Sequence, residues 1–112
     1  MTLAAAGRSV PTDDEGYLIE PADWSREIAG EMARREHIVL TEAHWAVIGF
    51  MREYFERRQI APDARHVIKF LAQFRGEDGG GRNELFELFP YGYVKQACRI
   101  AGMRRPRAWS TG

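Results

Sequence analysis

The chain has 112 residues, 45% apolar and 29% charged, which is typical of one globular domain and excludes a collagen-like or wholly disordered chain. Its sixteen basic residues balance its sixteen acidic ones, so the overall charge does not indicate a nucleic-acid-binding protein. The single cysteine, Cys98, excludes an intrachain disulfide and a cysteine-based zinc site, and a free thiol suits a reducing compartment. No apolar run approaches the ~20 residues of a membrane helix, and we expect a cytoplasmic protein.

The N-terminal region combines a polar stretch, a turn signal and a β-prone run. Residues 1–12 lack the pattern of an export signal and predict a flexible tail. Asp13–Gly16 (DDEG) predicts a turn, and Tyr17–Ile19 (YLI) predicts a short strand that Pro21 ends. Since so short a strand needs a partner, we expect a small hairpin or meander near the N-terminus.

Apolar residues at helical spacing predict about five helices. The first helix follows Pro21 and Ala22, and the second runs from the N-cap Thr41 to about Arg58. The third spans residues 63–74, and a short fourth is capped by Asn83 and ended by Pro90. The fifth spans residues 93–101, with Gly102 as its C-cap. The fold class is therefore mostly α within the α+β class: a short N-terminal β-meander or hairpin packed on an array of about five helices.

The segments outside the helices divide the chain. Residues 76–81 (GEDGGG) predict an exposed loop. We expect one folded domain over residues 13–103 and, because Pro106 prevents the last helix from continuing, a basic and mobile arm over residues 104–112. Nine acidic and three basic residues lie between positions 13 and 42, whereas the chain from position 95 onward has five basic residues and no acidic one. The arm is therefore suited to an anionic partner or to the acidic half of its own chain.

Few residues indicate a conventional enzyme. The glycine run lacks the lysine and hydroxyl of a phosphate-binding loop. The three histidines, His37, His44 and His66, lie apart in the sequence, and a pair of them without a third ligand makes a poor metal site. We expect His44 to be a partly exposed surface residue. The sequence therefore predicts neither a metal nor a cofactor.

Cys98 is a candidate nucleophile that is subject to opposing influences. It lies near the C-terminal end of the last predicted helix, where the helix dipole raises the pKa of a thiol. Lys95, Arg99 and the arginine-rich arm add positive charge, which lowers that pKa. A pair of Cys98 with a histidine would depend on the fold, and most lone cysteines are inert core residues.

The second and third predicted helices allow an alternative, a helix-turn-helix DNA-binding regulator. Arg57, Arg58, Arg65 and Lys69 lie around the turn between them. An ordinary helical hairpin with charged outer faces fits the zero net charge better, so we do not expect nucleic acid as a partner.

Leu85–Gly102, with the sequence LFELFPYGYVKQACRIAG, is long and distinctive. It resembles the C-terminal signature of the DsrC and TusE family, which comprises the gamma subunit of dissimilatory sulfite reductase and tRNA 2-thiouridine synthesizing protein E. Residues 14–18 (DEGYL), 21–24 (PADW), 40–45 (LTEAHW) and 60–62 (IAP) fit the same family. The resemblance extends from about residue 13 to about residue 106.

The resemblance implies a short β-meander, about five helices and a mobile C-terminal arm. It also implies sulfur carriage, as a cysteine persulfide or as a trisulfide between two cysteines, from sulfurtransferases of the TusBCD or DsrEFH type to a downstream enzyme such as sulfite reductase. Cys98 matches the earlier of the two cysteine positions. The later position, on the arm, normally takes and delivers sulfur, and here it is Trp109. The two-cysteine trisulfide therefore cannot form within this chain.

Two functions from different classes follow. In the first, the chain is a sulfur-relay protein that accepts or senses persulfide sulfur at Cys98, with Lys95 and Arg99 stabilising the persulfide charge and with no conventional active site beyond this. In the second, it is a non-catalytic docking or regulatory protein of the same pathway, with Cys98 in the core or acting as a redox sensor. The first is the function that we predict, and the second is the alternative, which the missing arm cysteine favours.

Overall fold

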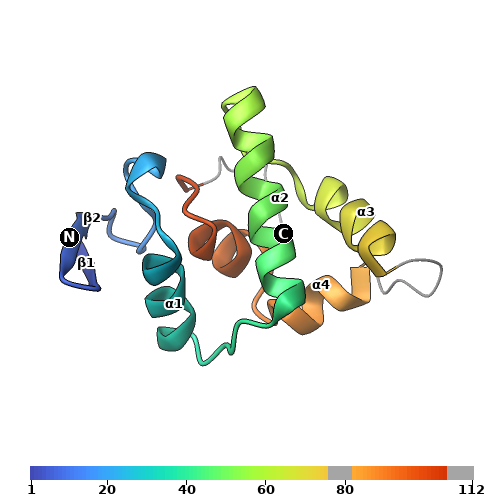
Figure 1. Cartoon of the computed structure of the whole chain (residues 1–112), viewed down its shortest axis with the longest axis horizontal. Helices are drawn as coiled ribbons and strands as arrows, with labels where there is room; N and C mark the ends of the chain where they lie inside the picture. Colours follow the sequence, from blue (N-terminus) through green and yellow to red (C-terminus); the bar gives the residue numbers. More distant parts are fainter. Residues whose placement is uncertain (76–81, 106–112) are drawn as a thin grey trace.

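The structure, a computed structural model, describes residues 1–75 and 82–105 and is mostly helical (Figure 1). Its elements in chain order are the strands β1 (Thr2–Ala5) and β2 (Arg8–Pro11), the 3-10 turn η1 (Pro21–Asp23), the helices α1 (Arg26–Arg35), α2 (Glu42–Arg58), α3 (Ala64–Arg75) and α4 (Arg82–Leu88), and the π-helical segment η3 (Tyr93–Cys98). The predicted class, a short hairpin with a mainly helical array, is confirmed. The loop expected at 76–81 and the arm residues 106–112 lie outside the described residues.

The N-terminal hairpin occupies the segment for which the sequence predicts a flexible tail, and that prediction is wrong. β1 pairs antiparallel with β2, and the facing side chains of Leu3 and Val10 are both buried. The turn between the strands has positive φ at Ala6 (51°) and Gly7 (79°), as tight hairpin turns require. Burial of one face therefore orders residues 1–12.

The β-prone run that follows takes a different role from the predicted one. Tyr17 and Leu18 are buried, but the run adds only one isolated bridge, between Leu18 and Thr12. Asp13 Oδ1 accepts hydrogen bonds from the backbone N–H groups of Glu15 and Tyr17, at 2.9 and 3.0 Å. The acidic stretch is thus the predicted turn, and it directs Tyr17 into the interior.

Side-chain caps begin the first two helices. Ser25 Oγ accepts from the Ile28 N–H at 3.2 Å and begins α1. Thr41 caps α2, which ends at Arg58 as predicted, and Gln59 follows with φ +61°. α3 lies within one residue of its predicted bounds. α4 begins at Arg82, so Asn83 lies inside the helix and is not its cap.

The helices surround a single cluster of buried apolar side chains. Its largest fully buried members include Tyr17, Phe89, Ile48, Met51, Leu71 and Ile100. Ile28 and Met32 of α1 point into this cluster, as their spacing of four residues predicts. Among the described residues no helix is long and apolar enough to cross a membrane.

The C-terminal helix starts as η3 and continues helically through Arg99 and Ile100. Its end is the predicted one: Gly102 has φ +80°, and the Met103 N–H donates to the Cys98 carbonyl at 3.0 Å. A side chain at Gly102 would not fit, because a Cβ there would come within 2.4 Å of Trp24 Cδ1. This close packing holds the end of the helix against the N-terminal half of the chain.

Candidate functional site

Cys98 occupies the last position of η3, and none of its surface is exposed to solvent. The nearby Ala97 and Ile100 are also fully buried and belong to the same core cluster. Attack on a donor persulfide requires the sulfur to reach solvent or a partner. In this conformation the thiol reaches neither.

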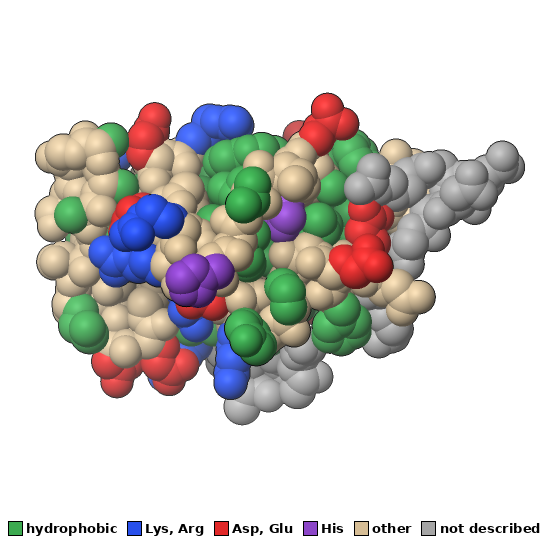
Figure 2. Space-filling model, turned by 90° about the horizontal axis from the view of Figure 1, so that it is seen from below, with side chains coloured by type: hydrophobic (Ala, Val, Ile, Leu, Met, Phe, Trp, Pro, Cys, Tyr) green, Lys and Arg blue, Asp and Glu red, His purple; other side chains and the backbone are tan. Residues whose placement is uncertain are grey.

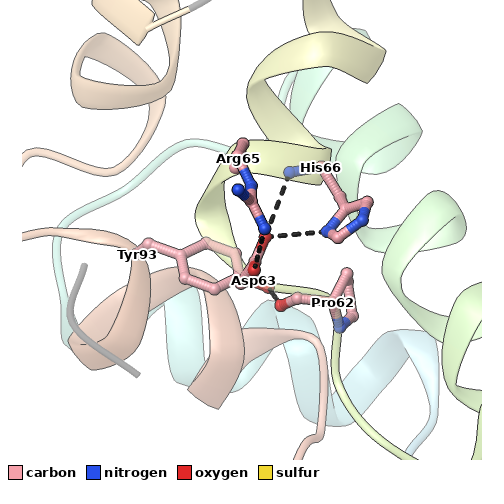
Figure 3. Close-up of polar contacts among 5 residues, drawn as sticks. All are labelled: Pro62, Asp63, Arg65, His66 and Tyr93. Carbon is pink, nitrogen blue, oxygen red and sulfur yellow. Dashed lines mark hydrogen bonds and ion pairs between the residues drawn. The ribbon is translucent and has the colours of Figure 1, made fainter. Parts of the chain in front are cut away.

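A hydrogen-bonded chain runs from Cys98 through Tyr93 to Pro62. The Tyr93 hydroxyl donates to the Pro62 carbonyl, which lies just before α3 (Figure 3). The same hydroxyl hydrogen-bonds with the Cys98 thiol. This contact lowers the pKa of the Cys98 thiol, as expected where a hydroxyl can donate to the thiolate. A thiolate at Cys98 would need that phenol proton to turn away from Pro62.

The electrostatics of Cys98 are dominated by burial. Removal from water raises the pKa of the Cys98 thiol to about 12, and the hydrogen bond with Tyr93 offsets only part of this effect. At neutral pH the thiolate fraction is then roughly one in 10⁵, and the thiolate is the reactive form. Burial, which was not among the influences considered from the sequence, is therefore the largest effect on the pKa of this thiol.

The two candidate charge stabilisers differ in their surroundings. Lys95 is exposed. Arg99 pairs with Glu36 Oε2 at 3.3 Å, and its guanidinium lies 5.3 Å from the centroid of the Tyr17 ring. Glu36 also accepts from Gln96 Nε2 at 2.9 Å. Arg99 thus ties the C-terminal helix to the end of α1.

A tryptophan and an arginine clamp the end of the C-terminal helix. Trp24 Nε1 donates to the Ile100 carbonyl at 2.9 Å, and Arg52 of α2 donates to the carbonyls of Ala101 at 2.8 Å and Pro21 at 3.0 Å. The Arg52 guanidinium lies 4.4 Å from the centroid of the Trp24 ring. These contacts satisfy carbonyls that the helix end leaves without intrahelical partners.

Sequence reasoning missed this clamp and the role of Tyr93. Trp24 and Arg52 reveal no pairing through local spacing, because their targets lie 76 and 49 residues away. Tyr93 precedes Cys98 by five residues, the spacing of hydrogen-bonded residues in a π-helix. Because an α-helix pairs residues four apart, the α-helical pattern in the sequence does not indicate this contact.

The base of the C-terminal arm lies along the N-terminal acidic segment. Arg104 Nε donates to the Ile19 carbonyl at 3.1 Å, and Arg105 pairs with the Glu15 carboxylate. Both arginines are exposed. The part of the arm that the structure describes thus contacts the acidic half of its own chain, one of the two arrangements that the charge pattern allows. Trp109, which stands in place of the second cysteine, lies outside the described residues.

His44 is buried, with 5% of its surface exposed, and the expectation of a partly exposed residue is wrong. Its Nε2 lies 2.8 Å from the Leu88 carbonyl and must carry the proton, so Nδ1 accepts from the Thr41 N–H at 3.0 Å. Burial lowers the pKa of His44. His44 therefore joins α2 to α4 as a neutral ring, while His37 is exposed beyond α1. Among residues 1–75 and 82–105, no group of three or more His, Cys, Asp or Glu side chains is placed to hold a metal ion.

The basic residues of the helix-turn-helix alternative separate into two groups. Arg57, Arg58 and Lys69 border a groove between α2 and α3. Arg65 pairs with Asp63 at 3.4 Å, beside the contact of 2.7 Å between His66 Nδ1 and the same carboxylate (Figure 3). The hydrogen bonds of Asp63 with His66 lower the pKa of Asp63, against the effect of its partial burial.

An apolar surface surrounds the loop between α1 and α2. Ile38, Val39, Leu40 and Trp45 line an open groove of about 580 Å³ there. Val39 is 81% exposed. Figure 2 views the molecule from the side of this loop and shows hydrophobic side chains exposed among charged ones. We call these four residues the loop groove.

Comparison with known proteins gives consistent results. A model of the DsrC-like protein family matches residues 4–108. The chain is 47% identical over 100 residues to sulfurtransferase TusE of Sodalis glossinidius, covering 89% of this chain and 93% of that protein. It is 42% identical over 104 residues to sulfurtransferase TusE of Yersinia pestis, covering 93% and 95%.

Solved structures agree with these relatives. The crystal structure of the oxidized gamma subunit of dissimilatory sulfite reductase (DsrC) from Archaeoglobus fulgidus superposes with a TM-score of 0.86 at 32% identity, covering 96% of this chain and 98% of that one. The NMR structure of Allochromatium vinosum DsrC gives a TM-score of 0.84 at 42% identity, covering 96% of each chain. The family match spans nearly the whole sequence and the fold is shared, so this chain belongs to the DsrC/TusE family of sulfur-relay proteins.

Proposed function

We propose that this chain is a docking or regulatory protein of a sulfur-relay pathway, in which Cys98 is a core residue and carries no sulfur while the domain is folded. The observation that carries the proposal is the complete burial of Cys98. The high pKa of the thiol, which is caused by burial, supports it. The replacement of the arm cysteine by Trp109 agrees with it.

The partner in this proposal is a sulfurtransferase of the TusBCD or DsrEFH type, or a sulfite reductase, and the site of action is the cytoplasm. The names of the relatives support a sulfur-relay partner. The loop groove is the candidate contact surface, because Val39 in its lining exposes apolar area that the fold leaves uncovered. The arm base, Arg104 and Arg105, is a second candidate contact for an anionic partner, which would compete with Glu15 for Arg105.

Persulfide carriage at Cys98 is the competing proposal. In it, the Cys98 thiolate attacks the outer sulfur of a donor persulfide, a new S–S bond forms at Cys98, and the donor leaves as a thiolate. Lys95 and Arg99 would stabilise the product charge. This chemistry requires the C-terminal helix to open, and it would break the clamp of Trp24 and Arg52.

One pair of measurements distinguishes the two proposals. A purified TusBCD-type sulfurtransferase should bind the wild-type chain and the Cys98→Ala variant with equal affinity. Mass spectrometry of the folded chain, after incubation with a persulfide donor that loads a two-cysteine homologue, should show no gain of one sulfur at Cys98. Loss of binding in Cys98→Ala, or a sulfur added to the folded chain, would favour carriage instead.

A matched pair of surface variants tests the contact surface. Val39→Asp should weaken the binding of the sulfurtransferase about ten-fold, because it places a charge in the loop groove. Ile60→Asp changes another exposed apolar residue that lies outside this groove, and it should leave binding unchanged. Equal effects of the two variants would exclude the loop groove as the contact surface.

A further inference from the structure

A second groove lies between α2 and α3, away from the loop groove. It encloses about 310 Å³, at the lower end of the ~300–1,000 Å³ range of small-molecule sites. Phe50, Tyr54 and Phe70 form its aromatic lining, and Arg57, Arg58 and Lys69 form its basic lining. Aromatic faces combined with positive charge are typical of sites that bind nucleotides.

The charge in this groove departs from the neutral average of the chain. Arg57, Arg58 and Lys69 are opposed within the lining only by Glu53. Glu53 lies 3.6 Å from Arg57, and both side chains are mostly exposed, so this ion pair holds Arg57 weakly. Three exposed cations around one cavity can neutralise a phosphate group without breaking a buried contact.

The aromatic lining presents ring faces as well as edges. Phe50 and Phe70 stack with centroids 4.6 Å apart, which joins the two helices into one apolar wall. Arg58 lies over the Tyr54 ring, 5.0 Å from its centroid. A planar group therefore already reaches the face of Tyr54 from the solvent side, and a nucleobase has the shape to take the same place.

We propose that the groove between α2 and α3 binds a nucleoside phosphate, with its base against Tyr54 and the Phe50–Phe70 wall and its phosphate on Arg57, Arg58 and Lys69. An inorganic anion would use only the basic side chains and leave the aromatic faces unused. An acidic peptide would match the charge but has no planar ring for Tyr54. The chemistry is the same for a free mononucleotide and for one nucleotide of a single strand. The proposal is independent of sulfur docking.

The test is an NMR titration of the full ¹⁵N-labelled chain with four probes: AMP, an adenosine RNA pentamer, inorganic phosphate and a glutamate-rich peptide. AMP or the pentamer should shift amide signals around the groove, at Tyr54, Arg57 and Lys69. Phosphate alone should bind about ten-fold more weakly or not at all. A response to AMP identifies a free nucleotide as a sufficient ligand, and a response to the pentamer alone identifies a nucleotide within a strand.

Matched variants separate stacking from charge. Tyr54→Leu should raise the Kd of the responding nucleotide about ten-fold, and Tyr54→Phe, which keeps the ring, should change it less than two-fold. The double variant Arg57→Gln/Lys69→Gln should also raise Kd about ten-fold. Arg8→Gln, an exposed change in β2, should have no effect.

Several results would overturn the proposal. These are no response to AMP or to the pentamer, an equal response to phosphate alone, or binding of the acidic peptide in place of both nucleotides. Equal affinities of Tyr54→Leu and Tyr54→Phe would also overturn it, because the base would then not stack on this ring.

Discussion

The C-terminal helix and the groove between α2 and α3 use reactive and charged residues in opposite ways. In the helix, Cys98 is sealed in the core and Arg99 is engaged by Glu36 and Tyr17. In the groove, Arg57, Arg58 and Lys69 border an open cavity. The residue types of the helix suggest sulfur chemistry, but its thiol is buried and the pKa of that thiol is raised. The burial and ion pairing of a side chain, rather than its residue type, decide which region can bind a ligand.

The two regions also differ in rigidity. Long-range hydrogen bonds from Trp24, Arg52 and Tyr17 hold the C-terminal helix. The Tyr17 hydroxyl donates to the Val94 carbonyl at 2.8 Å. The basic side chains of the groove are at most weakly paired, through Glu53. Changes in the helix should therefore affect stability, and changes in the groove should affect binding.

The largest expected effect is at Gly102, where the helix end meets the clamp. Gly102→Ala should lower the free energy of unfolding by about 2–4 kcal/mol, because the added Cβ meets Trp24 and because φ is +80°. Gly30→Ala in α1 is the control. No atom lies within 4 Å of the added Cβ there, and alanine should raise stability by roughly 0.5–1 kcal/mol. Urea unfolding measures both, and equal effects would show that the clamp is loose.

The next effect is at Tyr93. Tyr93→Phe should cost about 1–3 kcal/mol, because the Pro62 carbonyl and the Cys98 thiol both lose their hydrogen-bond partner inside the protein. Tyr91→Phe removes the same hydroxyl from a side chain that is 73% exposed, and it should be nearly neutral. If the two variants unfold at the same urea concentration, the chain of hydrogen bonds through Tyr93 adds nothing to stability.

A smaller effect is expected from pH through His44. Burial lowers the folded pKa of His44 below its usual 6.5, so the unfolded chain takes up the proton first as the pH falls. The stability contributed by neutral His44 should be complete above pH 6.5 and should be lost below it, by at most about 1.4 kcal/mol per pH unit. Urea unfolding at pH 7.5 and pH 5.5 measures this loss. His44→Gln should reduce the difference between the two pH values, whereas an unchanged difference would assign it to other groups.

The smallest effect is at the base of the arm. Arg105 and Glu15 are both about half exposed, so Arg105→Ala should change stability by no more than ~0.5 kcal/mol. Arg52→Ala, in contrast, removes two hydrogen bonds to carbonyls and should cost several times more. Thermal unfolding of both variants makes the comparison, and a large loss in Arg105→Ala would extend the rigid region into the arm.

The sequence predicts those features that depend on local pattern. The cap at Thr41, the end of the C-terminal helix at Gly102 and the buried stripe of α1 follow from short-range rules, and the structure confirms them. The family resemblance also holds, because its signature is a continuous segment. Local rules fail where a distant partner decides the outcome. His44 is buried because it bonds Leu88, which is 44 residues away.

The candidate site shows the same limit. The sequence identifies Cys98, Lys95 and Arg99 as neighbours in the chain, but the contact of Cys98 with Tyr93 and that of Arg99 with Glu36 depend on the fold. The location of the N-terminal hairpin within residues 2–11 differs from the prediction for another reason, because Ala6 takes a positive φ that alanine rarely adopts. Burial of Leu3 and Val10 offsets that local strain, and a propensity-based reading does not include it.

The central claim is that Cys98 is sealed in the folded domain. The most direct test compares the rate at which iodoacetamide alkylates Cys98 in the native chain with the rate in the urea-unfolded chain. We predict that native labelling is slower by several orders of magnitude and that it accelerates with urea in parallel with global unfolding. Native labelling within roughly ten-fold of the unfolded rate, and independent of urea, would contradict the claim and would return Cys98 to the role of sulfur carrier.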